Sequence, residues 1–415
     1  MTLALDAVRP ELQADEPNAW RLETPGAGQW PRTARPGDPR KYLMISTDTH
    51  ANEPPDLWEK RIEARYRDRL PKTWIDEKGV RWRKAEGNDK PDRLILASLS
   101  GQDQARSRSG AGAENRLRDH ALDGIDAELI FPNKGLAMWY TPDPEFAQAQ
   151  CRVYNDWAWE EFGLYAQRLA PVAAIAAGDI EGSVAEVQRV ARMGYRALAL
   201  PCKPTYGPGK VGDLNYNSAR FDPLWAAIQD ADLPICFHIS TGKDPRTARG
   251  DGGAVVNYVC HSLSPAIEPV ANLCASGVIE RFPRLRFGTV EAGIGFVAWM
   301  LHAMDEAYRV HHFSALPKLK HLPSDYYRSN GFSTFQEDAV GLETAERHGL
   351  VDNFMWANDY PHHEGTWPHS AQAIERTMGF LSDESRAKVL GLNAARVFKF
   401  DVDVLTGGAG RGAAA

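Results

Sequence analysis

Short apolar runs alternate with longer amphipathic stretches over most of the chain. This alternation is typical of repeated strand–helix–strand units, and near-continuous apolar runs fit strands that are buried on both faces. The pattern predicts eight strands, at residues 42–48, 127–133, 170–175, 195–201, 233–239, 284–291, 331–336 and 354–359. It predicts helices between and after them, at residues 145–168, 180–193, 221–231, 264–281, 296–313, 340–348, 370–379 and 383–398.

Eight strands that take turns with helices predict an α/β fold, a (β/α)8 TIM barrel with an insertion after the first strand and an extended N-terminal arm. Residues 1–40 are rich in Pro, Gly and charge, and we expect them to form this arm on the surface. The barrel is predicted over residues 41–400, with residues 56–123 as the insertion. Residues 401–415 end in a low-complexity tail that we expect to fray.

The insertion contains two distinct patterns. The segment TWIDEKGVRWRK predicts a hairpin that turns around Glu77, Lys78 and Gly79. The segment SLSGQDQARSRSGAGAEN, residues 98–115, has the small and polar composition of a mobile lid over the barrel mouth, although a plain surface loop has the same composition.

Charge, hydrophobicity and cysteine spacing argue against several classes of function. The formal net charge of −7 gives no field that would gather nucleic acid or anionic lipid, so we expect a small-molecule substrate. We find no signal-peptide pattern and no apolar run of membrane-spanning length, which predicts a cytoplasmic protein that does not act on membranes. The five cysteines are scattered without CxxC spacing, which argues against a disulfide scaffold.

Polar side chains stand at the ends of four predicted strands, where a barrel carries its active site. The first strand ends with Asp48 and His50, the fifth with His238, the sixth with Glu291 and the eighth with Asp359. Residues two apart on a strand face the same side, so the first pair points together. One such residue alone fits a hydrogen-bonded core histidine or a helix N-cap. Together, imidazoles and carboxylates after apolar runs indicate a site for zinc, iron or manganese.

Four segments resemble the amidohydrolase superfamily, in the amidohydrolase-2 branch that includes aminocarboxymuconate-semialdehyde decarboxylase and related aromatic-acid decarboxylases. The resemblance runs from about residue 42 to 400 and agrees in order and spacing. It implies a metal-dependent enzyme on a TIM barrel. The segments are DTHANEPPDLW (48–58), FHISTG (237–242), VEAGIGFVAWML (290–301) and WANDYPHHEGTWP (356–368).

The resemblance implies that Asp48, His50, His238 and Asp359 are metal ligands. This chain has an Asp at position 48 where many family members have a His, and Glu291 where many have a His at the end of the sixth strand. Glu291 therefore invites two interpretations. It acts on a metal-bound water as a general base, or it is a further ligand that supports a second metal.

Weaker candidates surround this set. Glu53, His362 and His363 are candidates for contact with substrate or with a second metal; a surface carboxylate and loop-orienting histidines are the alternatives. With these donors the site has enough ligands for a dinuclear iron or manganese centre. Aromatic rings after the second and eighth strands are expected to line a pocket or to pack under the lid: Trp139, Tyr140 and Trp367.

The first hypothesis for the activity is hydrolysis of a small carboxylic, amide or ester substrate by a metal-activated water, with Asp359 moving the proton and Glu291 assisting. One alternative is a dinuclear non-haem iron oxygenase (hydroxylase) or thioesterase. The other is a non-oxidative aromatic-acid decarboxylase. The arm and the family resemblance predict a homo-oligomer or an assembly with a related subunit.

Overall fold

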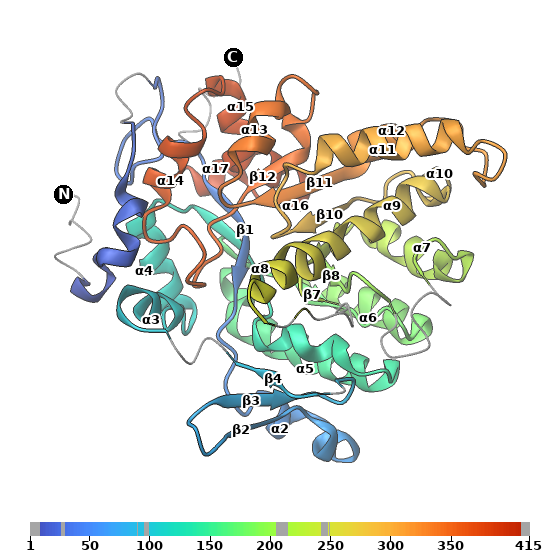
Figure 1. Cartoon of the computed structure of the whole chain (residues 1–415), viewed down its shortest axis with the longest axis horizontal. Helices are drawn as coiled ribbons and strands as arrows, with labels where there is room; N and C mark the ends of the chain where they lie inside the picture. The colour runs from blue at the N-terminus through green and yellow to red at the C-terminus, as the bar shows by residue number, and fades with distance from the viewer. Residues whose placement is uncertain are drawn as a thin grey trace.

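The computed structural model describes residues 9–25, 30–88, 90–94, 99–204, 215–241, 248 and 250–407. Parallel strands form two sheets, with the orders β1-β5-β6 and β12-β11-β10-β9-β8-β7 (Figure 1). This confirms the predicted α/β fold with parallel strands. The strands are β1 (Ile45–His50), β5 (Ala127–Phe131), β6 (Leu169–Pro171), β7 (Ala173–Ala174), β8 (Leu198–Leu200), β9 (Ile235–His238), β10 (Phe287–Val290), β11 (Gly331–Phe335) and β12 (Phe354–Trp356).

The two sheets meet at both sides. On one side only Val172 separates β6 from β7, so the third predicted strand is divided between the sheets. On the other side β1 lies along the end of β12, where the His50 amide donates to the Tyr360 carbonyl at 2.7 Å and the Asp359 amide donates to the Asp48 carbonyl at 3.0 Å. This second contact brings the first and eighth predicted strands together.

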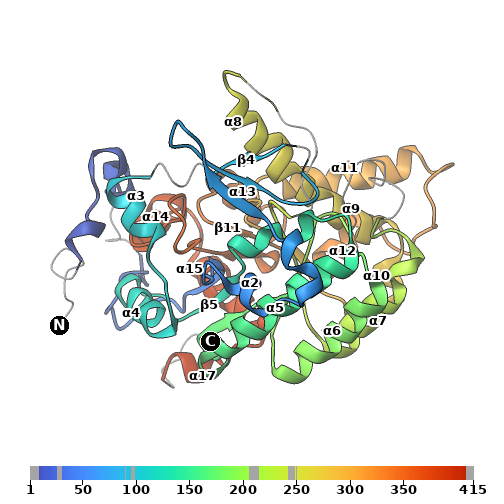
Figure 2. The same cartoon turned by 90° about the horizontal axis from the view of Figure 1, so that it is seen from below.

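Helices follow the strands and cover the sheets from outside (Figures 1 and 2). Predicted helix 264–281 is broken where Gly277 takes the left-handed conformation, at φ 74°. Helix α6 shows how the sequence sets its bounds: the Asp179 side chain caps its first turn, and Gly194 ends it with φ 105°. These helices are α5 (Pro144–Phe162), α6 (Ile180–Met193), α7 (Asp222–Ala231), α8 (Gly253–Val256), α9 (Ile267–Ala275), α10 (Val278–Arg281), α11 (Val297–Val310), α12 (Pro323–Asn330), α13 (Ala339–Ala345), α14 (Ser370–Thr377), α15 (Asp383–Ala387), α16 (Asn393–Phe398) and α17 (Val402–Leu405).

The region after β1 is more structured than its composition suggests. It holds α2 (Leu57–Arg61) and an antiparallel sheet, with the expected turn between Asp76 and Val80. The described part of segment 98–115 contains α3 (Gly101–Ser107) and the start of α4 (Ala113–Asp123) in place of an open loop. Whether any of it moves as a lid stays a prediction. The strands of the sheet are β2 (Lys72–Ile75), β3 (Arg81–Lys84) and β4 (Asp92–Arg93).

The ends of the chain also differ from a plain arm and tail. The N-terminal segment forms two 3-10 turns, η1 (Pro10–Leu12) and η2 (Glu16–Leu22), with Leu12 and Arg21 buried. The expected fraying tail falls mostly on residues 408–415, which lie outside the described residues, and α17 precedes them. None of the helices described is long and apolar enough to cross a membrane.

Candidate metal centre

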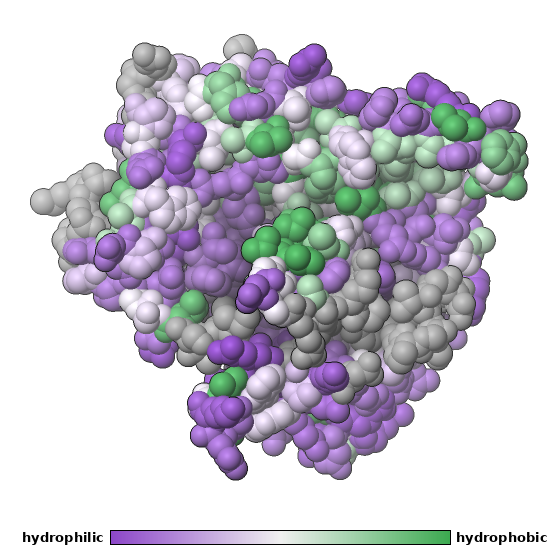
Figure 3. Space-filling model, in the orientation of Figure 1, coloured by the Kyte–Doolittle hydropathy of each residue, from purple (hydrophilic) through white to green (hydrophobic). Residues whose placement is uncertain are grey.

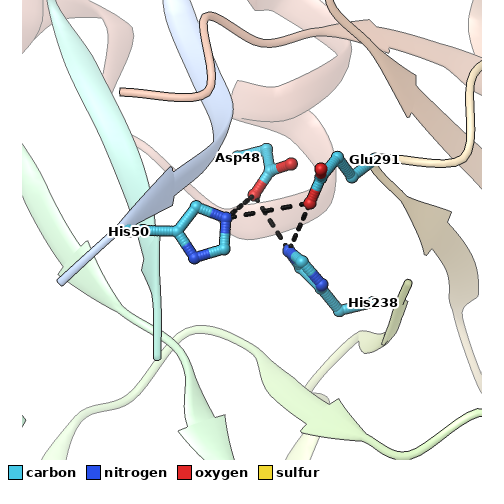
Figure 4. A group of neighbouring side chains, drawn as sticks. All are labelled: Asp48, His50, His238 and Glu291. Carbon is cyan, nitrogen blue, oxygen red and sulfur yellow. Dashed lines mark ion pairs between the residues drawn. The ribbon is translucent and has the colours of Figure 1, made fainter. Parts of the chain in front are cut away.

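Four side chains from three strand ends converge in one buried group (Figure 4). Asp48 and His50 come from β1, His238 from the end of β9, and Glu291 follows β10. The Asp48 Oδ1 atom lies 3.4 Å from His238 Nε2 and 3.6 Å from His50 Nε2. The Glu291 Oε2 atom lies 3.3 Å and 3.8 Å from the same two nitrogens. Ligands about 2.1 Å from one ion stand roughly 3.0–3.4 Å apart, so the group can hold a divalent metal.

The two imidazole rings are oriented by hydrogen bonds at their Nδ1 atoms. His50 Nδ1 lies 2.9 Å from the Pro132 carbonyl, and His238 Nδ1 lies 2.7 Å from the Ile239 carbonyl. Both Nε2 atoms face the group and have no hydrogen-bond partner among the described residues, nor do the Asp48 carboxylate oxygens. Buried polar atoms without partners are costly. A bound cation would satisfy all of them, so the residues present fit a metal ion.

A second group shares members with the first. Asp359 Oδ1 lies 3.4 Å from His50 Nε2 and 3.2 Å from His362 Nδ1. The His362 ring stacks on the His50 ring with centroids 3.9 Å apart. Possible ligand groups therefore include His50, Asp359 and His362, and also Glu291, Asp359, His362 and Glu364.

Burial and crowding shift the acidities of these side chains. Burial, followed by repulsion from Asp359, raises the pKa of Glu291 well above its usual range. Burial opposes the charged form of Asp359, but His362 and His50 outweigh burial and lower its pKa. Burial also opposes a charged His50, yet Asp359 and Asp48 raise the His50 pKa to about 9. Without a cation, the group therefore retains protons that a metal would have to displace.

A family model described as amidohydrolase matches residues 47–400. The chain belongs to this amidohydrolase family. The match covers every strand of the two parallel sheets except the first two residues of β1. It therefore confirms the family resemblance, and it leaves the N-terminal arm outside the shared region.

Known proteins of similar sequence and structure include an amidohydrolase and two decarboxylases. The amidohydrolase is 24% identical over 301 residues to gamma-resorcylate decarboxylase of Rhodococcus jostii strain RHA1. This alignment covers 69% of this chain and 86% of the relative. Its fold is similar to an amidohydrolase from Mycobacterium avium subsp. paratuberculosis K-10, with a TM-score of 0.68, 21% identity, and coverage of 87% of this chain and 99% of the other. It is also similar to a manganese-bound dihydroxybenzoic acid decarboxylase from Polaromonas sp. JS666, with a TM-score of 0.59, 19% identity, and coverage of 86% and 97%.

Two site residues of the amidohydrolase have unusual backbones. Glu291 and Asp359 both take the left-handed region, at φ 62° and 54°. Residues with side chains seldom adopt this conformation, and such strain gathers at functional sites because the surrounding structure enforces it. Here the conformation turns each chain sharply at its strand end and leaves the carboxyl group facing the imidazoles.

The strand that carries His50 is supported by a buried ion pair. Arg116 donates to the His50 carbonyl at 2.8 Å and to the Thr49 hydroxyl at 2.9 Å. The same guanidinium contacts both Glu128 oxygens at 2.7 Å, and His120 lies 2.7 Å from Glu128. All of these side chains are buried, so the network fixes the position of β1 at the centre.

The weaker candidates fall in different places. Both Glu53 oxygens accept hydrogen bonds from the backbone amides of residues 133–135, and Glu53 is in none of the ligand groups found among the described residues. His363 contacts Glu364, and among the residues described it belongs to none of the ligand groups. Trp139 lines a cavity of about 210 Å³ together with Pro201 and Lys203. Trp367 instead packs against Tyr360 in the interior.

Sequence patterns missed two residues beside the centre. Glu364 belongs to one ligand group but follows His363 in a loop, where no periodicity marks it. Tyr258 lies in a π-helix, Asn257–Leu263, and burial and the nearby carboxylates, Glu291 foremost, raise its pKa to about 12. It continues an exposed apolar patch over α8, visible near the middle of Figure 3, with Val255, Val256 and Val259.

Proposed function

We propose that this amidohydrolase is a metal-dependent, non-oxidative decarboxylase of an aromatic carboxylic acid. The observation that carries the proposal is the buried Asp48, His50, His238 and Glu291 group, with atoms that lack hydrogen-bond partners within the described structure. The similar gamma-resorcylate decarboxylase supports decarboxylation over the hydrolysis that we expected first. We also infer that the two sheets close into the eight-stranded barrel of the family, because β1 bonds to the end of β12.

Asp48, His50 and His238 would hold the metal, together with Asp359 and with Glu291 as a further donor. When bound, a divalent cation supplies positive charge that anchors an acidic substrate and draws electrons from its ring. Loss of carbon dioxide breaks the bond between ring and carboxyl carbons and leaves the electron pair on the ring. A proton must then replace the carboxyl group.

The Asp359–His362 pair is placed to supply that proton, because His362 Nδ1 lies 3.2 Å from Asp359 Oδ1. The pair can donate the proton to the ring carbon and recover it from water, while Glu291 serves as a metal donor. Asp359 is fully buried, which keeps bulk water from competing at this step.

The test is anaerobic release of carbon dioxide from gamma-resorcylate by the Mn²⁺-loaded protein, with the reaction repeated in D₂O. We expect one deuterium on the ring carbon for each carbon dioxide released. Asp359→Asn should lower kcat by at least about 100-fold. Hydrolysis of esters or amides without carbon dioxide release, or a requirement for oxygen, would exclude the proposal.

The overlapping ligand groups support a second candidate, a dinuclear metal enzyme. Together the three groups contain seven residues, which is more than one ion requires: Asp48, His50, His238, Glu291, Asp359, His362 and Glu364. Such a centre would fit an oxygenase or a thioesterase. Mass spectrometry of protein purified without chelators distinguishes the two. One manganese or zinc per chain supports the decarboxylase, and two irons support the dinuclear enzyme.

A further inference from the structure

The N-terminal segment from residue 9 to 25, here called the arm clamp, packs on the loop that follows β12. This segment precedes the family match, which starts at residue 47, so it is an addition to the shared fold. Leu12 is fully buried and clusters with Tyr360 and Trp367. In both Figures 1 and 2 the blue N-terminal segment lies beside α3 and α14. The clamp therefore contacts the loop of residues 359–368, here called the β12 loop, which carries Asp359.

Arg21 makes the most direct connection. Its Nη1 atom donates to the Gly365 carbonyl at 2.8 Å, and its Nη2 atom donates to the His363 carbonyl at 2.9 Å. Its Nε atom donates to Asn18, which keeps the guanidinium oriented. The side chain is buried, and hydrogen bonds from a charged donor are stronger than neutral ones. One residue of the clamp therefore binds two carbonyls of the loop.

Helix α3 also binds the β12 loop. Arg106 is fully buried and donates to the same Gly365 carbonyl. The clamp holds α3 in turn, because Asp15 accepts from the Gln102 amide at 2.9 Å and Asn18 donates to Asp103 at 3.1 Å. The clamp and α3 therefore act on the loop as one unit.

The β12 loop is tightly folded, so a shift of residues 363–365 would also move the residues of the loop that belong to the ligand groups. A Cβ atom on Gly365 would overlap the Asn358 carbonyl and lie 2.8 Å from the Asp359 carbonyl. The His362 amide donates to the Asp359 carbonyl at 2.8 Å, and the His362 ring stacks on His50. Displacing residues 363–365 would therefore move Asp359 and His362 with them.

We propose that the arm clamp positions Asp359 and His362 at the metal centre, with Arg21 as a positioning residue of that centre. The inference rests on the proposed metal-dependent function. Contacts that orient metal ligands contribute to metal affinity, and loss of such contacts typically weakens this affinity by about 10–100-fold.

The test compares three variants of the full chain: Arg21→Ala, Arg21→Lys and the control Arg35→Ala. Arg35 also makes two hydrogen bonds from the N-terminal region, but its partner is Glu375 on α14. The first readout is hydrogen–deuterium exchange of residues 359–368 in metal-free protein. The second is Mn²⁺ affinity by calorimetry. Thermal unfolding of each variant checks that the barrel is folded.

Arg21→Ala should speed exchange in the β12 loop and weaken Mn²⁺ binding by about tenfold or more. Arg21→Lys should recover part of both, because a single ammonium nitrogen replaces the two guanidinium nitrogens that bond the loop. Arg35→Ala should change neither. Equal loop exchange and equal affinity in Arg21→Ala and Arg35→Ala would overturn the clamp. Absence of Mn²⁺ binding in the unmodified chain would refute the proposed function instead, and the exchange measurement would still decide the clamp.

Discussion

We expect replacement of Glu291 by Gln to have different effects on the melting temperature of the metal-free protein and of the Mn²⁺-loaded protein. Burial and repulsion from Asp359 raise the Glu291 pKa well above its usual range, so the metal-free site favours the neutral, protonated form of this side chain. Glutamine has nearly the same size and is also neutral. We therefore expect the melting temperature of metal-free Glu291→Gln to stay within about 1 °C of the unmodified chain.

The Mn²⁺-loaded forms of the unmodified chain and of Glu291→Gln should differ in melting temperature. At this position, 3.3 Å from His238, glutamate offers a negatively charged ligand and glutamine does not. Mn²⁺ at 100 times its Kd stabilises by about 2.7 kcal/mol. An unfolding entropy of roughly 2.1 cal/mol/K per residue gives about 0.9 kcal/mol/K for 415 residues, hence a rise of about 3 °C. If Glu291→Gln weakens affinity about 100-fold, the same Mn²⁺ stabilises by about 0.4 kcal/mol and the rise falls to about 0.5 °C.

Differential scanning calorimetry over a Mn²⁺ series measures both quantities, with Glu268→Gln on α9 as the control. The unmodified chain should also bind Mn²⁺ more tightly as pH rises, because the Glu291 proton must leave, and this slope should flatten in Glu291→Gln. An unchanged Mn²⁺-dependent rise in Glu291→Gln would show that Glu291 is not a ligand and would refute the reasoning.

Three further changes test the surroundings of the centre. Glu128→Gln leaves the buried Arg116 guanidinium without its counter-charge and should lower the free energy of unfolding in urea by about 3–5 kcal/mol. Gly365→Ala should weaken Mn²⁺ binding in calorimetry, because its Cβ would overlap the Asn358 carbonyl. Burial raises the Asp123 pKa from 3.8 to about 7. The unfolded chain therefore releases this proton at lower pH than the folded one, and Asp123 should make stability fall as pH rises through that window. Asp123→Asn should remove this contribution when unfolding is measured at about pH 5 and about pH 8.

The strands and the main members of the site were predictable because their signals are local. Apolar runs marked the strand positions, and polar residues at the ends of those runs marked Asp48, His50, His238, Glu291 and Asp359. The structure brings these residues together because parallel strands carry their C-terminal ends to the same side. Local spacing was also enough for the hairpin between Asp76 and Val80.

What sequence patterns missed depends on contacts between distant residues. Segment 98–115 has loop-like composition, yet it contains α3 because the side chains of Gln102 and Arg106 become buried between the N-terminal segment and the β12 loop. Arg21 bonds to His363, 342 positions away. Glu53 lies within the first motif and stays a candidate from the sequence alone, whereas its hydrogen bonds to the backbone amides of residues 133–135 come from a segment 80 positions away.

Charge gives a further reason for two buried arginines beside this centre. The ligand groups contain three buried carboxylates, Asp48, Glu291 and Asp359, and the exposed carboxylate of Glu364 adds a further negative charge beside them. Burial lowers the Arg106 pKa to about 10, so Arg106 stays charged at neutral pH, and Asp359 and Glu364 are among the carboxylates that favour its charged form. Arg21 and Arg106 thus bind the β12 loop through its carbonyls and bring positive charge to the same place. A sequence that kept the ligands but lost the arm would retain the donors and lose the contacts that orient Asp359.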